Sequence, residues 1–297
     1  MPSRDVARAK VVELRQRALG ERQRAARAAA IGAEYEARRA LTKNSLQPLR
    51  VRMADLHRRL EARHLEAARL QELHASRLEM WARRRDPVTA WPTFIEAVAS
   101  AVGGGSTAVI MLGSEGVETL VAASDRTARL AHDVEFVMGE GPARDVAASN
   151  LTVRAQGDAL VERWPRFGPI VADHGVGSLI SLPLRQEPGG CLGALSIYAA
   201  TATVPANIAA TSVRVADALT HTVLNVPGTV ADDEIPAVPM FDESDFLAKV
   251  HQAAGMVSVQ QSCETDDAVA ILRARAFADG LPLETLADHV IHGDVRI

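Results

Sequence analysis

The stretch SLPLRQEPGGCLGALSIYA, residues 181–199, decides the fold of the middle of this chain. Two apolar runs, Gly177–Leu184 and Cys191–Tyr198, lie on either side of QEPGG, which is a clear turn signal. Short apolar runs separated by a Pro-Gly turn are typical of paired β-strands. We therefore predict an antiparallel strand pair at this place.

The segments before and after this pair extend the pattern. Thr107–Leu112 and Val117–Ala123 are two more apolar runs, joined by a turn at Gly113–Gly116. Apolar residues at helical spacing mark Trp91–Val102 before the strands and Asn207–Leu224 after them. The order of elements along the chain is a helix, antiparallel strands, a loop-and-helix insertion, further strands and a helix. This order predicts an α+β sandwich with its helices on one face of the sheet.

Residues 1–85 contain no strand pattern and are rich in Ala, Arg, Glu and Leu, which are good helix formers. Pro48 interrupts this segment, because proline inside a helix loses a hydrogen bond and its ring clashes with the preceding turn. We predict two helices that meet near Gln47. They either fold back as a hairpin or form one kinked coiled coil.

A heptad seam follows Pro48, with residues at alternating spacings of four and three. Polar side chains weaken the seam at three positions, and a polar-rich helix of this length needs a partner surface. We predict that a homodimer supplies it. The seam consists of Leu49, Met53, Leu56, Leu60, Arg63, Ala67, Leu70, His74, Arg77 and Trp81.

The charge is distributed unevenly along the chain. The formal net charge is −4, yet residues 1–85 hold most of the Lys and Arg, and the remainder is acidic. Such asymmetry can indicate an arm that binds nucleic acid or an anionic membrane. It also fits a solvated helical surface, because Glu residues are interleaved with the Arg residues throughout.

Composition excludes several classes of protein. With 297 residues, 47% hydrophobic and 24% charged, the chain is expected to be globular and to hold more than one domain. Its two cysteines, Cys191 and Cys263, rule out a disulfide framework. No apolar run is long enough to span a membrane, and the N-terminus lacks an apolar h-region. We predict a cytoplasmic protein that does not contact membranes.

The residue pattern offers no case for catalysis. No serine, histidine and aspartate set surrounds a nucleophile turn. His132 and His174 are isolated and lack the paired spacing of metal ligands. We therefore predict a protein that is not an enzyme, with no catalytic residue, no metal and no resident cofactor.

A linker and a helical segment follow the sandwich. Val226–Met240 contains three prolines and three adjacent acidic residues, so residues 225–242 read as a linker. Residues 243–297 show only helical spacing. A first helix carries an apolar stripe. A second helix runs over Asp266–Ala278 with Thr265 as its N-cap, and a third begins at Pro282. The stripe is Phe246, Val250, Ala253 and Val257.

Gly255 lies within the first of these helices. Glycine in a helix costs about 1 kcal/mol relative to alanine. We expect the glycine to permit close approach of another helix backbone. Three short helices then form a bundle.

The middle segment, about residues 88–224, resembles the GAF domains of actinobacterial regulators. The resemblance rests on GEGPARDVAASN (139–150), RWPRFGP (163–169) and the opening stretch. It implies a sensor module that binds a small molecule or serves as a dimerisation platform. A ligand pocket is expected between the sheet and residues 125–175, with no residue set that identifies the ligand.

Two features of this segment have alternative interpretations. The turn GEGP should begin a helix, because Pro142 suits a first helical turn, and it could also hold an anion on its N–H groups. The lysine and hydroxyl of a phosphate-binding loop are missing, which favours a structural role. Trp164 and Phe167 are expected to be core or lid residues rather than groups that stack on a ligand.

Residues 243–297 resemble the ANTAR domain, a three-helix RNA-binding module of bacterial antitermination regulators. The matching pieces are QAAG (252–255), CETDDAVAILRARA (263–276) and LPLETLADHVI (281–291). The resemblance implies binding of hairpin RNA as a dimer in transcription antitermination. The RNA-binding residues it implies are Gln252, Ala254, Gly255, Arg273 and Arg275.

One departure from the family bears on RNA binding. Ala254 stands where the family carries lysine, and acidic residues outnumber basic ones in this segment. Basic side chains supply most of the non-specific affinity for nucleic acid, so binding must rely on a local patch around Arg273 and Arg275. Ala254→Lys is expected to strengthen RNA binding. Alternatively, Arg275 forms an ion pair with Asp279, and the bundle is a scaffold element that has lost RNA binding and mediates dimerisation or docks a protein partner.

Overall fold

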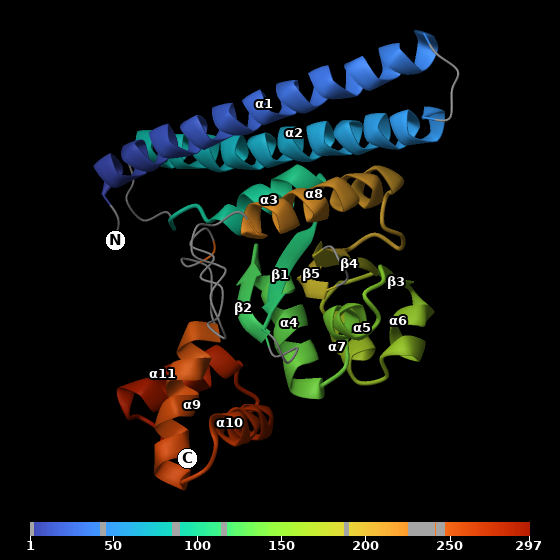
Figure 1. Ribbon diagram of the computed structural model, residues 1–297. Helices are drawn as coiled ribbons and strands as arrows, with labels where there is room; N and C mark the ends of the chain where they lie inside the picture. Colours follow the sequence, from blue (N-terminus) through green and yellow to red (C-terminus); the bar gives the residue numbers. More distant parts are fainter. Residues whose placement is uncertain are drawn as a thin grey trace. The chain divides into compact units, whose positions relative to one another are not determined.

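Figure 1 shows a computed structural model of the chain, which describes residues 3–41, 46–84, 90–113, 118–186, 190–224, 241 and 247–297. The chain divides into two compact units. The first, a helical unit, comprises Met1–Gly104 and Ala206–Thr229, and the second, an α/β unit, comprises Gly105–Pro205 and Val230–Ile297. The predicted linker lies outside the described residues except for Phe241, which is buried.

Two long helices, α1 (Arg4–Leu41) and α2 (Gln47–Arg83), form an antiparallel hairpin in the helical unit (Figure 1). Ion pairs join them along their length, with Arg15 to Glu79 at 2.5 Å and Arg22 to Glu72 at 2.7 Å. The proline at the start of α2 lies in its first turn, where no intrahelical hydrogen bond is lost. Of the two predicted arrangements, the hairpin is therefore confirmed.

Helices α3 (Phe94–Val102) and α8 (Ala206–Leu224) complete the helical unit and pack against α2. The three polar residues of the heptad seam all make contacts on this side of α2. They join α2 to α3, to α8 and to the segment that precedes α3. The contacts are Arg63 to Asp217 with two hydrogen bonds of 2.8 Å, His74 to the Pro92 carbonyl at 3.2 Å, and Arg77 to Glu96 at 3.1 Å.

The predicted seam is only partly correct. Leu70 is fully buried, whereas Leu49 is 47% and Leu56 is 41% exposed. The reason is that α2 contacts α1 on one side and α3 with α8 on another, so its buried surface is wider than a two-helix seam. Contacts within the chain supply much of the partner surface that we assigned to a second copy, and the homodimer stays a prediction.

The α/β unit contains a five-stranded antiparallel sheet in the order β2-β1-β5-β4-β3. The opening stretch forms β4 and β5, which pair so that Ser181 faces Ser196 with their hydroxyls 2.8 Å apart. The two predicted strand pairs are confirmed, and the short edge strand β3 was not anticipated. The strands are β1 (Ser106–Leu112), β2 (Glu118–Ala123), β3 (Val153–Gln156), β4 (Ser178–Gln186) and β5 (Gly190–Ala199).

The insertion between β2 and β4 contributes four helices, and two of these, α4 and α5, pack against the central strands. Trp164 and Phe167 are buried in the resulting core with Tyr198, and the rings of Trp164 and Phe167 meet edge to face at 5.6 Å. Their predicted role as core residues is confirmed. The helices are α4 (Arg126–Met138), α5 (Pro142–Ser149), α6 (Asp158–Arg163) and α7 (Phe167–Asp173).

The C-terminal bundle consists of α9 (Leu247–Gln261), α10 (Thr265–Asp279) and α11 (Leu283–His292), which contact one another in every pairing. The described residues of the predicted stripe, Val250, Ala253 and Val257, are buried. One detail is corrected, because the N-cap of α10 is Glu264 rather than Thr265 and its side chain makes no capping hydrogen bond.

The described structure is thus a mixed α+β protein with long N-terminal helices, an antiparallel sheet in the middle and helices at its C-terminus. Among the described helices, none combines the length and the apolar character needed to cross a membrane.

Candidate functional site

The candidate site lies where α4 meets the sheet and the C-terminal bundle within the α/β unit. The side chain of Asp125 caps α4 by accepting a 2.9 Å hydrogen bond from the Ala128 N–H, and Gly139 ends the helix in the left-handed conformation. This helix presents His132, Glu135 and other residues to the core on one face. Two titratable side chains on a buried helix face are unusual and require partners.

Glu118 on β2 is the partner of His132. The His132 Nε2 and Glu118 Oε2 atoms are 2.9 Å apart, and both side chains are buried. Burial opposes the imidazolium, but the Glu118 carboxylate outweighs it and raises the pKa of His132 to about 9. Burial also opposes the carboxylate, yet His132 holds the pKa of Glu118 below its ordinary value. The two residues form a buried ion pair that fastens α4 to the sheet edge.

Our expectation that His132 is isolated was therefore wrong, because its carboxylate partner comes from a strand elsewhere in the sequence. His174 lies at the surface, where its Nδ1 is 2.8 Å from the Ile170 carbonyl oxygen.

Glu135 occupies the beginning of α5. Its Oε1 accepts a 2.8 Å hydrogen bond from the Arg144 N–H, and its side chain lies against Gly141, where a Cβ would come within 2.5 Å of it. The GEGP turn therefore does hold an anion, but that anion is a carboxylate of the protein itself. Burial raises the pKa of Glu135 to about 7, and the Arg144 hydrogen bond opposes the rise.

The other glutamate of this turn, Glu140, has a similar role at α7. Its Oε1 accepts hydrogen bonds from the N–H groups of Arg166 and Phe167, at 2.5 and 3.0 Å. Both glutamates thus satisfy backbone donors at helix starts, which confirms the structural role favoured for GEGP.

Arg273 on α10 extends this cluster into the bundle. Its guanidinium carbon lies 3.4 Å from the centre of the Phe136 ring on α4. Its charge also contributes to lowering the pKa of Glu118. A guanidinium over an aromatic face is held by the ring quadrupole. The side chain that we expected to contact RNA therefore lies against helix α4.

A second contact joins the same elements. Arg129 on α4 pairs with Glu284 on α11 at 2.7 Å and with Asp133 at 3.3 Å. Lys249 on α9 pairs with Glu284 at 3.2 Å and with Asp288 at 3.0 Å. The bundle is thus tied to α4 through an ion-pair network in addition to the Arg273 contact.

The five predicted RNA-binding residues lie on two helices, three of them on α9 and both arginines on α10, and their environments differ. Arg275 pairs with Asp279 at 2.7 Å, as the alternative interpretation predicted, and Gln252 is exposed. Ala254 is fully buried, so a lysine at this position would have to enter the core. The expectation that Ala254→Lys strengthens RNA binding is withdrawn for this reason.

The expectation for Gly255 also needs correction. This glycine is exposed, and no described atom outside its own helix turn lies within 4 Å of a Cβ built there. Close approach of a helix backbone does not explain it. The described structure offers no packing reason for the residue.

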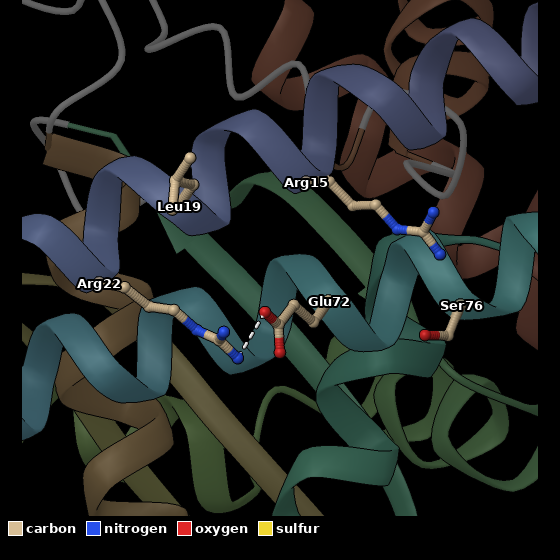
Figure 2. Close-up of a pocket in the computed structure, with 5 residues that line it drawn as sticks. All are labelled: Arg15, Leu19, Arg22, Glu72 and Ser76. Carbon is tan, nitrogen blue, oxygen red and sulfur yellow. Dashed lines mark ion pairs between the residues drawn. The ribbon is translucent and has the colours of Figure 1, made fainter.

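One cavity among the described residues lies away from the place where we predicted a ligand pocket, and the predicted pocket stays a prediction. The cavity has a volume of about 410 Å³ and lies on the α1–α2 hairpin, lined by the residues labelled in Figure 2. Figure 2 shows the ion pair of Arg22 with Glu72, two of the residues that line it. Between the sheet and residues 125–175, buried side chains including Trp164, Phe167 and Tyr198 fill the core.

The buried polar residues around α4 could be predicted only in part from the sequence. His132 and Glu135 lie three residues apart among buried apolar residues, which could have indicated one polar patch on a buried helix face. Nothing in the spacing could have connected them with Glu118 or with Arg273.

Comparisons with known proteins add little to this geometry. No protein-family model matches the chain, and no curated protein matches it. Among solved structures, the chain is similar to a domain assigned to a two-component sensor histidine kinase protein from Sinorhizobium meliloti 1021. That match has 14% sequence identity and a TM-score of 0.33, and it covers 43% of this chain and 84% of that one. A likeness this weak supports no functional argument.

Proposed function

We propose that this protein is a sensory regulator of transcription in which the sandwich receives a signal and the C-terminal bundle binds hairpin RNA as a dimer, acting in antitermination. The proposal rests on the resemblance of the two segments to GAF and ANTAR domains. The observation that carries it is the contact of Arg273 with Phe136, because it joins the RNA-binding candidate directly to the sensor-like core.

This contact suggests how a signal could reach the bundle. Phe136 lies on α4 next to the buried pair of Glu118 and His132, so a shift of α4 changes the surface on which Arg273 rests. A signal acts only if it favours one arrangement of α4 over another. In the arrangement described here, the guanidinium lies against the Phe136 ring.

Two other basic side chains of the bundle agree with a restrained state. Lys249 and Arg275 are both paired with carboxylates. Each phosphate neutralised by a basic side chain adds to RNA affinity. Releasing Arg273 from the sandwich would add one such group at the surface of α10, where contacts to a hairpin loop can form.

A gel-retardation assay of the full chain with a two-hairpin leader RNA tests the proposal. Phe136→Leu should raise the affinity, because it removes the ring that holds Arg273, and Arg273→Ala should lower it. Arg154→Ala is the matched control, since Arg154 is exposed on β3 and its loss removes the same charge. The affinity should fall as salt is added. Equal retardation of an unrelated RNA without hairpins would contradict the proposal.

A second candidate function is a signalling scaffold whose bundle docks a protein partner or mediates dimerisation. The observation that favours it is that large apolar side chains of the bundle face solvent, with Val259 81% and Phe277 63% exposed. Such side chains can be anchors for a partner. Crosslinking to cellular RNA, compared with affinity capture of proteins by wild type and by Phe277→Ser, separates the two functions.

A further inference from the structure

Three potential metal ligands meet in the helical unit. Glu21 comes from α1, His64 from α2 and His221 from α8, and their ligand atoms all lie within 4.8 Å of one another. The side chains are only 15%, 12% and 19% exposed. They are far apart in the sequence, so no spacing motif could have revealed them.

The distances are close to those of a metal site. Glu21 Oε2 lies 2.6 Å from His64 Nδ1 and 3.9 Å from His221 Nε2. The two imidazole rings meet edge to face with their centres 4.8 Å apart. Ligand atoms around a tetrahedral zinc ion, with bonds of about 2.0–2.1 Å, lie about 3.3 Å apart. Small rotations of the side chains would produce that arrangement.

A neighbouring arginine holds one of the ligands in place, and a nearby ion pair joins the helices that carry the other two. Glu21 Oε1 accepts a hydrogen bond from Arg24, which leaves Oε2 directed toward the two histidines. Arg63, next to His64, donates two hydrogen bonds of 2.8 Å to Asp217, which lies one turn before His221 on α8. This pair fixes α2 relative to α8 at the level of the cluster. An outer group that orients a ligand, as Arg24 orients Glu21, is typical of metal sites.

The charges facing the cluster are balanced in part. Arg24 and Arg63 are positive and oppose a cation, but each already has a carboxylate partner in Glu21 or Asp217. Two imidazoles and one carboxylate suit zinc and similar divalent transition metals, whereas calcium and magnesium prefer oxygen ligands.

We propose that Glu21, His64 and His221 form a binding site for one Zn²⁺ ion that joins α1, α2 and α8. Three protein ligands leave one coordination position for water. The ion would connect the hairpin to α8 and stabilise the helical unit, because it binds the folded arrangement and not the separated helices. The site is independent of the proposed RNA binding.

The test is titration of the metal-free full chain with Zn²⁺ in a calorimeter and with Co²⁺ in a spectrophotometer. We expect one equivalent to bind, a Co²⁺ spectrum of tetrahedral type without thiolate charge transfer, and a rise in Tm with added Zn²⁺. Glu21→Gln, His64→Gln and His221→Gln should each weaken binding by more than about tenfold. His174→Gln, which changes an exposed histidine of the α/β unit, is the matched control and should bind as wild type.

A second measurement does not depend on the folding of the variants. Zn²⁺ should protect His64 and His221 of the wild-type protein from diethylpyrocarbonate, as read by mass spectrometry, and should leave His174 reactive. The proposal is overturned if neither ring is protected or if His64→Gln/His221→Gln still binds one equivalent. It is also overturned if replacing Cys191 and Cys263 with Ser abolishes binding.

Discussion

The guanidinium carbon of Arg273 lies 3.4 Å from the centre of the Phe136 ring, so a side chain of α10 rests directly on α4. Arg129 and Glu284 make a second connection between α4 and the bundle at 2.7 Å. Arg273, the candidate for RNA binding, and helix α4 are thus in contact in one compact unit.

Phe136→Leu and Arg273→Met should destabilise the α/β unit together by less than the sum of their separate effects. A cation over an aromatic ring contributes about 0.5–2 kcal/mol, and each single change already removes it. A double-mutant cycle in urea, followed by the fluorescence of the buried Trp164 in a Trp81→Phe/Trp91→Phe background, measures this coupling. Arg275→Met with Phe136→Leu is the control pair, and its two effects on the free energy of unfolding should add. If the effects of Arg273→Met and Phe136→Leu also add, the contact makes no contribution to stability and the interpretation is refuted.

Glu118→Gln should destabilise the α/β unit by about 3–5 kcal/mol, because it leaves the buried His132 without its counter-charge. Glu118→Leu/His132→Phe should cost less than Glu118→Gln, since it removes both charges. Urea unfolding with the same Trp164 probe compares the variants. The interpretation fails if the double replacement is the more damaging of the two.

The same pair predicts a loss of stability in alkali. The folded pKa of His132 is raised to about 9, so its contribution is fully present below the unfolded value of about 6.5 and is lost as the pH rises through 9. Trp164-detected stability measured from pH 6 to pH 10 should show this decline. Glu118→Leu/His132→Phe should flatten it, and an unchanged slope would assign the decline to other groups.

Glu135→Gln should remove a different pH dependence. Burial raises the pKa of Glu135 to about 7, so its contribution is present below the ordinary value of 4.5 and is lost as the pH rises through 7. Glutamine keeps the acceptor for the Arg144 N–H and cannot ionise. At pH 8 the variant should be more stable than wild type by up to about 3 kcal/mol. Asp158→Asn, which changes an exposed carboxylate, is the control and should leave the profile as it is.

His74 should make the helical unit sensitive to acid. Burial lowers its pKa to about 4, against a hydrogen bond with the Pro92 carbonyl that raises it. The folded state therefore resists protonation, and stability should fall as the pH drops from about 6.5 to about 4. His74→Gln keeps a donor for the carbonyl and should reduce this fall. Hydrogen exchange of the α2 and α3 amides measures the loss of stability at each pH. His174→Gln is the control and should leave this loss unchanged.

Two glycine substitutions should have opposite effects. Gly255→Ala should stabilise the bundle by about 0.5–1 kcal/mol, because the position is helical and no described atom crowds a Cβ there. Gly141→Ala should destabilise the sandwich, because a Cβ would come within 2.5 Å of the Glu135 side chain. Thermal unfolding of both variants gives the comparison. If Gly255→Ala instead destabilises the bundle, another molecule, such as a second copy of the chain, must pack closely against this position.

The helices and strands were largely predictable because their signals are local. Apolar runs flanking QEPGG and helical spacing in Asn207–Leu224 reflect which side chains each element must bury. The edge strand β3 was missed because four residues with alternating burial carry too weak a pattern. The site was predicted less well, since Ala254 proved to be buried and Arg273 to lie on Phe136.

By itself, the sequence determined most of the elements of this protein, from strands β4 and β5 to the three C-terminal helices. The tertiary structure decided which charged groups meet. Glu118 reaches His132 from a strand, Glu135 fills the start of α5, and Glu21 lies between His64 and His221 from three helices. The physical reason is the distance along the chain over which each effect acts, because helix and strand preferences depend on a few neighbouring residues. A buried charge, by contrast, takes whatever partner the packed chain brings within a few ångströms.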